Sequence, residues 1–308
     1  MGRILLTGIA GQLGQELKPI LTPLGDVIGV DRQTLDLAQP DKIRQVIGEV
    51  KPDLIVNAAA YTAVDKAETE TELANAINGT APTIMAEEAQ QLGAALIHVS
   101  TDYVFDGRKN TPYTEEDIPN PINAYGQSKL LGEEGIRKVC DRHIILRTAW
   151  VYGTYGKGNF VKTMLRLGAE RDELRVVVDQ VGTPSWTNDI ARAIAAIASR
   201  FADAQPRQHP DSVPMNPVST GTYHFTNSGA ISWYDFAVAI FEEAQQIGFP
   251  LKVRRVVPIS TPEYPTPAAR PAYSVLSTKK ISGVLGTHPP HWRSALRQML
   301  EQLYSQNS

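Results

Sequence analysis

The sequence contains a single cysteine, Cys140, among its 308 residues. One thiol excludes an internal disulfide framework and fits a reducing compartment, so we expect a cytoplasmic protein. The chain also lacks any apolar run near 18 residues, and its first residues lead directly into a short apolar segment. We therefore expect neither a signal peptide nor a membrane anchor.

Charge of one sign is not in excess either. The 30 lysines and arginines nearly balance the 33 acidic residues, which gives a net charge of -3. Such a chain has no broad basic surface for a phosphate backbone, so nucleic acid is not an expected partner. The hydrophobic share of 42% is ordinary for a globular enzyme, and the length suffices for one large domain with a smaller lobe.

Short apolar runs recur along the first half of the chain, at residues 4–7, 27–30, 54–56, 96–99 and 144–146. Their β-branched, unalternated composition is typical of strands buried on both faces of a parallel sheet. Apolar residues at three- and four-residue spacing predict helices over 41–50, 70–92 and 124–139. Together these patterns predict an α/β fold with a doubly wound, Rossmann-like parallel sheet.

The pattern changes after Gly153. Longer helices are expected at 160–171, 188–201 and 233–246, and prolines interrupt 204–218 and 258–271. We predict a dinucleotide-binding domain over 1–153, and a smaller, mainly substrate-binding lobe over 154–308 with some segments returning to the first domain. The proline-rich stretch 204–218 is interpreted as a surface loop without an assigned function.

A glycine-rich turn, containing Gly8, Gly11 and Gly14, follows the first predicted strand and opens a helix. Glycines let the backbone approach a pyrophosphate, and free N–H groups at the helix start bind its charge. This context favours a dinucleotide site over a plain tight turn. Small residues at 57–60, after the third strand, would likewise let a cofactor lie close, or simply form a turn.

Asp31 ends the second strand, where a carboxylate would meet the adenosine ribose hydroxyls or cap a turn. Arg32 beside it could pair with a 2′-phosphate. The pair therefore leaves NADPH and NADH both open, and we favour NADPH. Asp36 and Leu37 are candidates to border the adenine.

Tyr125 and Lys129 are four residues apart and thus share one face of a predicted helix. A free phenol, with a pKa near 10, is a weak acid at neutral pH, but a close cation would lower that pKa. Thr101 follows the fourth strand at the sheet edge where such folds bind ligands, and it could hold a substrate carbonyl or cap its turn. These features predict proton chemistry by Thr101, Tyr125 and Lys129.

Six segments resemble the extended short-chain dehydrogenase/reductases, and most closely the dTDP-4-dehydrorhamnose reductase family. They are residues 8–14, 56–68, 100–105, 125–129, 147–153 and 270–271. The resemblance implies substrate contacts at Thr101, Asp102 and Trp150. It implies nucleotide contacts at Gly11, Gln12, Leu13, Asp31, Asp36, Leu37, Ala60, Tyr61, Thr62, Tyr125 and Lys129.

The activity that the resemblance implies is reduction of the C4 ketone of dTDP-4-dehydro-β-L-rhamnose by NAD(P)H, with Tyr125 as the proton donor. The expected partner is thus a dTDP-linked 4-keto-6-deoxy sugar. Arg270 is a candidate for its diphosphate, since a guanidinium fork suits phosphate oxygens, and a structural ion pair is the equal alternative.

Related classes differ at single positions. Sugar-nucleotide dehydratases carry a glutamate where this chain has Tyr103, which disfavours elimination. The family also resembles the non-catalytic regulatory subunit of methionine adenosyltransferase, and the intact Thr101, Tyr125 and Lys129 speak against that alternative. Some members dimerise through Mg²⁺ held by glutamates. Glu16 matches one such position but Asn188 replaces another acid, so we predict no metal ligands and leave monomer and homodimer open.

Overall fold

The computed structural model describes residues 2–203 and 218–307. A six-stranded sheet with the order β10-β5-β4-β3-β1-β2 forms its centre, and every pair of neighbouring strands is parallel. The strands are β1 (Arg3–Thr7), β2 (Asp26–Val30), β3 (Leu54–Asn57), β4 (Ala95–Thr101), β5 (His143–Thr148) and β10 (Gly221–His224). The predicted doubly wound α/β fold is therefore confirmed.

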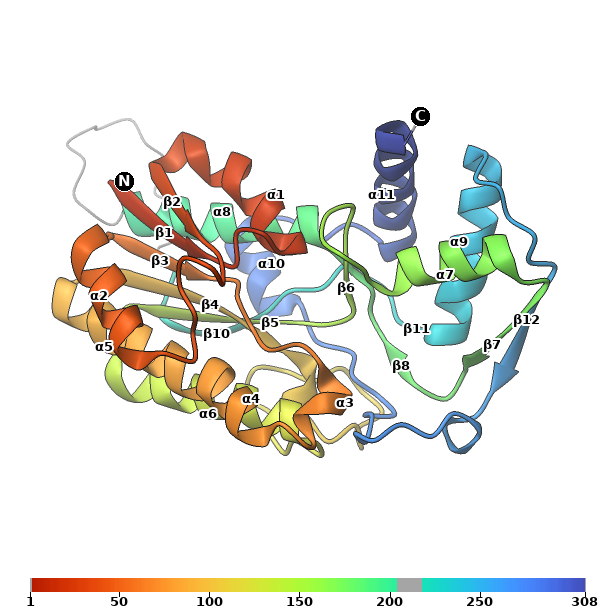
Figure 1. The fold of residues 1–308 in the computed structure, drawn as a ribbon, viewed down its shortest axis with the longest axis horizontal. Coiled ribbons are helices and arrows are strands. Elements are labelled where there is room, and N and C mark those ends of the chain that lie inside the picture. Colours follow the sequence, from red (N-terminus) through yellow and green to blue (C-terminus); the bar gives the residue numbers. More distant parts are fainter. Residues whose placement is uncertain (1, 204–217, 308) are drawn as a thin grey trace.

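Helices cover both faces of this sheet (Figure 1). One face carries α1 (Gln12–Leu21), α8 (Thr187–Asp203) and α10 (Lys279–Leu285); the other carries α2 (Pro40–Val50), α5 (Ala81–Leu92) and α6 (Ala124–Val139). Short helices α3 (Val64–Ala67) and α4 (Thr71–Asn75) precede α5, and a π-helical segment, η2 (Ala76–Thr80), joins α4 to α5. The predicted helix over 70–92 is thus a continuous run with a π-helical insertion.

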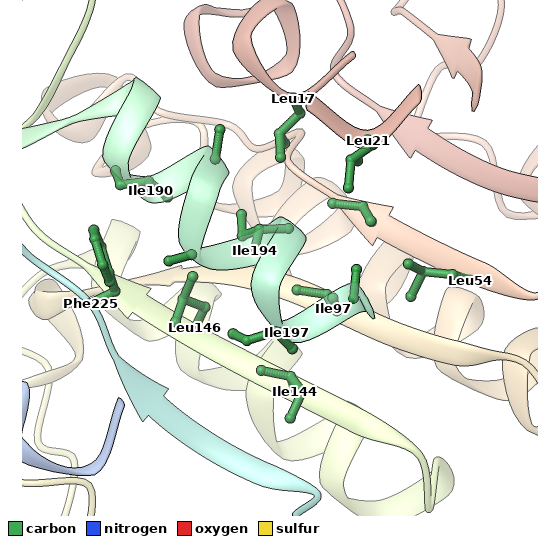
Figure 2. Close-up of a cluster of buried hydrophobic side chains, with 14 of the residues drawn as sticks. Leu17, Leu21, Leu54, Ile97, Ile144, Leu146, Ile190, Ile194, Ile197 and Phe225 are labelled. Atoms are coloured by element: carbon green, nitrogen blue, oxygen red, sulfur yellow. The ribbon is translucent and has the colours of Figure 1, made fainter. Parts of the chain in front are cut away.

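Alternating strand residues supply the two cores. Leu54, Ile97 and Ile144 point toward α1 and α8, where Leu17 and Ile194 meet them (Figure 2). Leu5, Ile55 and Leu96 point to the opposite face, against α2 and α5. Side chains buried on both faces explain why these strands show unalternated apolar runs.

A third hydrophobic cluster lies in the C-terminal half of the chain, away from the central sheet (Figure 1). It is built by α7 (Phe160–Glu170), α9 (Trp233–Ile247) and α11 (Trp292–Asn307). Two-stranded sheets accompany it: β7 (Glu173–Val177) pairs with β12 (Arg255–Ile259), and β8 (Val181–Gly182) with β11 (Ile231–Ser232). β6 (Val151–Tyr152) pairs with β9 (Ser185–Trp186) near the exit of the central sheet.

Three 3-10 turns complete the described elements: η1 (Thr22–Leu24), η3 (Asp102–Val104) and η4 (Thr261–Glu263). Of the stretch interpreted as a surface loop, 204–218, residues 204–217 lie outside the described residues. None of the described helices is long and apolar enough to cross a membrane.

Candidate active site

The glycine-rich turn joins β1 to α1 at the carboxyl edge of the sheet. Gly8 has φ +71°, in the left-handed region that favours glycine. A Cβ on Gly14 would lie 2.1 Å from the Gly8 carbonyl oxygen, so only glycine fits there. Gly11 is the N-cap of α1, with no side-chain cap. The uncapped N–H groups of this helix start are suited to a pyrophosphate.

The two residues after Gly11 differ in exposure. Leu13 is buried in the core between α1 and the sheet, so only its backbone is available to a ligand. Gln12 is half-buried, and its amide contacts the Val151 carbonyl and the Asn159 amide, both at 3.4 Å. Gln12 therefore links the turn to the segment that leads into α7.

Asp31 caps its own turn after β2. Its Oδ1 accepts hydrogen bonds from the backbone N–H groups of Gln33 and Thr34 and from the Thr34 hydroxyl, and these bonds hold its pKa below the usual value. Arg32 is exposed beside it. The carboxylate lies at the end of β2, next to the glycine-rich turn, because β1 and β2 are paired from Arg3 to Thr7.

Asp36 and Leu37 follow in the same connection. Asp36 Oδ1 accepts from the Ala38 N–H at 3.0 Å, and Leu37 is buried in the core under α2. As with Leu13, the structural environment of Leu37 leaves little of its side chain for a ligand.

The segment after β3 is fixed by one buried amide. Asn78 Oδ1 accepts from the Tyr61 N–H at 2.8 Å, and Asn78 Nδ2 donates to the Tyr61 carbonyl at 3.0 Å. The Tyr61 hydroxyl donates to Glu70. Ala60 is half-buried and Thr62 is exposed, so this segment presents backbone and small side chains at the same sheet edge as Gly8.

Tyr125 lies in the first turn of α6, which Asn123 caps by accepting from the Gly126 N–H. Its ring packs edge-on against Tyr103, with the ring centres 5.5 Å apart. Thr101 ends β4 and accepts from the Tyr103 N–H while donating to Asp102 Oδ1. The helix start and the strand end thus bring Thr101, Asp102 and Tyr125 into one cluster.

Burial controls the acidity of this cluster. It raises the pKa of Tyr125 to about 12, with the Thr101 side chain opposing the shift, and it raises the pKa of Asp102 to about 6. The Oδ2 atom of Asp102 is buried without a partner of hydrogen-bond geometry among the described residues, while the nearby Ser274 hydroxyl partly opposes the rise of the pKa. An unsatisfied buried acceptor is costly, and a ligand hydroxyl would satisfy it.

Lys129 shares a helix face with Tyr125, but its amine points into the protein. Nζ contacts the Val99 carbonyl at 2.8 Å and His98 Nε2 at 3.1 Å, and the side chain is 1% exposed. Burial lowers the pKa of Lys129 to about 8. The pKa of Tyr125 is raised by burial, lowered by Thr101 and raised by the charge of Asp102. The expected lowering of that pKa by the ammonium is therefore not seen in this structure, because Nζ is turned to β4.

Trp150 has φ +47°, a conformation that is strained for a bulky residue. Its ring stacks on Trp233 at 3.5 Å between ring centres and 5° between planes. Gly182 lies against the other part of the ring, where a Cβ would come within 2.5 Å of it. The strained backbone thus orients an aromatic face beside Trp233.

A cavity of about 720 Å³ opens between α7, β7 and the segment after β12. Phe160, Trp233 and Tyr264 supply aromatic walls, and three arginines (Arg171, Arg175 and Arg270) line it. Tyr103 also lines this cavity, and Tyr103 touches Tyr125, so the cavity adjoins the cluster of Thr101, Asp102 and Tyr125.

Arg270 faces both the cavity and an acid. Its guanidinium bonds to Asp65 at 2.9 Å and to the Ala268 carbonyl, and it lies 6.0 Å from the centre of the Tyr103 ring. The structure therefore contains the ion pair that was one alternative for Arg270, at a position where a diphosphate could compete for the same fork.

The Mg²⁺ donor set does not fit in this chain. Glu16 is buried and accepts from the Asn188 amide at 2.9 Å, so the second position offers a donor rather than a carboxylate. Among the described residues, no group of three or more potential metal ligands gathers.

Several residues that lie beside the site were not predicted from the sequence. Phe160, Arg175 and Trp233 line the cavity, and His98 contacts Lys129. The one signal in the sequence was His98, which lies inside an otherwise apolar strand run. A buried histidine at such a position needs a polar partner.

Comparison with known proteins gives concordant results. The family model described as "RmlD substrate binding domain" matches residues 2–305. The chain is 42% identical to a dTDP-4-dehydrorhamnose reductase of Escherichia coli K12, with 98% of both chains covered.

Solved structures agree. A dTDP-4-dehydrorhamnose reductase ortholog from Clostridium acetobutylicum has a TM-score of 0.87 at 39% identity, covering 98% of this chain and 99% of that one. A dTDP-4-dehydrorhamnose reductase from Bacillus anthracis, solved in complex with NADP, has a TM-score of 0.85 at 38% identity, covering 97% and 99%. A UDP-glucose 4-epimerase of Thermotoga maritima shares the fold at 19% identity, with a TM-score of 0.79.

Proposed function

Because the chain belongs to the dTDP-4-dehydrorhamnose reductase family, we propose that it reduces the C4 ketone of dTDP-4-dehydro-β-L-rhamnose to dTDP-L-rhamnose. It is an NADP-dependent oxidoreductase of dTDP-rhamnose biosynthesis. The observation that carries the proposal is the cluster of Thr101, Asp102 and Tyr125 between the glycine-rich turn and the cavity. The relatives do not favour the non-catalytic regulatory alternative.

The residues at the amino half of the sheet edge fit a dinucleotide. Gly8, Gly11 and Gly14 allow the tight turn that leaves the start of α1 uncapped for the pyrophosphate, and the backbone of Gln12 and Leu13 supplies N–H donors. The remaining contacts proposed for it are Asp31, Arg32, Asp36, Leu37, Ala60, Tyr61 and Thr62. The preference for NADPH over NADH follows from Arg32, which is exposed where it could meet a 2′-phosphate.

When bound, the cofactor supplies a hydride to the ketone carbon. Tyr125 is proposed to give its hydroxyl proton to the developing alkoxide, while the Thr101 hydroxyl holds the same oxygen. Asp102, whose Oδ2 lacks a partner among the described residues, would accept from a sugar hydroxyl. Lys129 is proposed to hold the nicotinamide ribose and to make the phenol more acidic, which requires its amine to turn from Val99 toward Tyr125.

The cavity is proposed to hold the dTDP portion. Aromatic walls suit a base, and Arg270 and Arg175 suit a diphosphate once it replaces their carboxylate partners, Asp65 and Glu263. Trp150 would face the deoxysugar. In this arrangement residues 1–153 form the dinucleotide domain, and the segments around α7, α9 and α11 form the substrate lobe, while α8 and β10 belong to the first domain.

The test is steady consumption of NADPH by the purified protein in the presence of the 4-keto sugar nucleotide, followed by absorbance. We expect turnover that depends on both components, with dTDP-L-rhamnose as the product. The matched control replaces the sugar nucleotide with dTDP alone. Saturable NADPH binding without consumption would favour the regulatory alternative instead.

A further inference from the structure

A row of buried polar side chains crosses the central sheet behind the active site. Thr7 on β1 is the register partner of Asn57 on β3, and Asn57 is the partner of His98 on β4. All three are at most 1% exposed, as is Lys129, which reaches His98 from α6. Two residues earlier on the same strands and the same face, the row is apolar: Leu5, Ile55 and Leu96.

Hydrogen bonds connect the row from end to end. Thr7 Oγ1 is 2.7 Å from Asn57 Oδ1, Asn57 Nδ2 is 3.0 Å from His98 Nδ1, and His98 Nε2 is 3.1 Å from Lys129 Nζ. A polar row in a buried layer costs stability relative to valine or isoleucine. Simple core packing therefore does not explain why three neighbouring strands place polar residues in one register, in contact with the buried lysine.

The first bond fixes the direction of the others. The Ala59 N–H donates to Thr7 Oγ1 at 3.3 Å, and the Thr7 hydroxyl donates to Asn57 Oδ1. Asn57 must then present its NH₂ group to His98, so His98 Nδ1 accepts and its proton is on Nε2. An Nε2–H group can only donate to Lys129, so the lysine must be a neutral amine in this arrangement.

The reverse arrangement keeps the same three side-chain contacts, with the Thr7 hydroxyl proton released from Asn57. If Lys129 is an ammonium, it donates to His98 Nε2, the imidazole proton moves to Nδ1, and Asn57 must present its oxygen to that N–H by turning its amide. Thr7 Oγ1 then accepts from both Ala59 and Asn57. The contacts of Lys129, His98 and Asn57 therefore have two arrangements, one for each form of the lysine.

We propose that the protonation of Lys129 is coupled to the tautomer of His98 and to the orientation of the Asn57 amide, which makes His98 a positioning residue for the reduction. The catalytic consequence rests on the proposed role of Lys129. Each turnover takes one proton from Tyr125 into the product hydroxyl, and that proton must be replaced, ultimately from water. A lysine that keeps its contacts to His98 and the Val99 carbonyl in both forms can lose and regain a proton without leaving either partner unsatisfied.

The electrostatic surroundings permit both forms. Burial lowers the pKa of Lys129 to about 8, and Glu133 on the same helix opposes this shift. Glu133 is itself paired with Arg147 from β5 and with Arg137 from α6. Burial, with Lys129 second, holds the pKa of His98 well below its usual value, so the imidazole stays neutral and changes only its tautomer. Tyr125, also on α6, and Asp102 on η3 are the titratable groups of the neighbouring cluster, and Asn78 on η2 is uncharged.

The test is the ¹⁵N spectrum of the histidine-labelled full chain, because protonated and unprotonated ring nitrogens have well-separated shifts. The His98 signals are assigned by their loss in His98→Leu. We expect the proton on Nδ1 at about pH 6 and on Nε2 at about pH 10, with a midpoint near the lysine pKa of about 8. In Lys129→Met the pH dependence should vanish. One tautomer throughout in the wild-type protein, or a switch that survives Lys129→Met, would overturn the proposal.

A kinetic measurement complements the spectrum. In His98→Leu the ammonium loses a hydrogen-bond acceptor in a buried site, so the alkaline limb of kcat should move down by about one pH unit. His143→Leu is the matched control, since His143 is also buried but bonds to the Cys140 carbonyl at the start of β5. An alkaline limb of kcat at the same pH in His98→Leu and His143→Leu would contradict the coupling. Loss of NADPH consumption in Lys129→Met tests the proposed function separately, because the spectrum reports the coupling whether or not the lysine takes part in turnover.

Discussion

Two buried basic side chains lie on the same side of the central sheet, and their surroundings are opposite. Arg147 on β5 forms two hydrogen bonds to Glu133, through Nε at 2.9 Å and Nη2 at 2.6 Å. Lys129, one helical turn before Glu133, contacts a carbonyl and an imidazole, and no carboxylate among the residues described. The paired arginine fastens α6 to β5, whereas the lysine without a carboxylate partner has a lowered pKa and can change its charge. The buried Arg147 with its counter-ion therefore stabilises the fold, whereas the buried Lys129 is suited to proton chemistry.

The largest effect is expected on the reactive side of this comparison. Lys129→Met should lower kcat for NADPH consumption by about 10²–10⁴-fold, because it removes the charge proposed to assist Tyr125. The melting temperature should stay the same or rise, since a buried amine is replaced by an apolar side chain of similar length. A Lys129→Met protein with a lower melting temperature but a wild-type kcat would show that the lysine stabilises the fold rather than takes part in the reaction.

On the structural side, Arg147→Met should cost about 3–5 kcal/mol of unfolding free energy, because it leaves the Glu133 carboxylate buried without its bidentate partner. Urea denaturation followed by circular dichroism measures the loss. The double variant Arg147→Met with Glu133→Leu should recover part of it. A single variant as stable as the wild type would show that the pair does not fasten the helix.

The pH dependence of stability separates the two cations further. The pKa of Lys129 falls from 10.5 to about 8 on folding, so between those values the unfolded chain binds more protons. Stability from this group should therefore rise with pH across that window and be at its lowest below it. Relative to Lys129→Met, the wild type should gain on the order of 2 kcal/mol between pH 8 and 9.5. A pH-independent difference between the two unfolding curves would argue against a depressed lysine pKa.

The smallest effect is expected for Arg137, which also pairs with Glu133 but from a position 35% exposed. Arg137→Ala should cost less than about 0.5 kcal/mol, because water and salt screen such a pair. The same urea assay applies, with Arg147→Met as the reference. A loss comparable to that of Arg147→Met would mean that exposure does not distinguish the two arginines.

The sequence predicts what local pattern determines. Buried strands such as β3 and β4 are apolar on both faces, and the glycine-rich turn is recognised by its position after β1. The sheet, its helices and the cofactor-binding end could therefore be predicted from the sequence. The sixth strand, β10, was missed because residues 221–224 combine a glycine with polar and aromatic side chains rather than an apolar run. Its place beside β5 is decided by tertiary pairing.

The site could be predicted from the sequence only in part, because tertiary contacts decide the rest. Tyr125 and Lys129 are four residues apart, so their shared helix face follows from helical geometry. The direction of the lysine amine does not, because it depends on a carbonyl and an imidazole from another strand. The polar row requires the register of β1, β3 and β4, and the cavity requires β7 to pair with β12 across some eighty residues. Such contacts leave no periodic signal in the chain.

The central claim is that the buried phenol of Tyr125 donates the proton in the reduction. It is tested most directly by the rate of NADPH consumption with the 4-keto sugar nucleotide in Tyr125→Phe, against Tyr152→Phe as a control whose hydroxyl is buried and unbonded within the described structure. The account predicts a fall of about 10²–10⁴-fold for Tyr125→Phe and a near wild-type rate for the control. A folded Tyr125→Phe protein that reduces the sugar at the wild-type rate would contradict it.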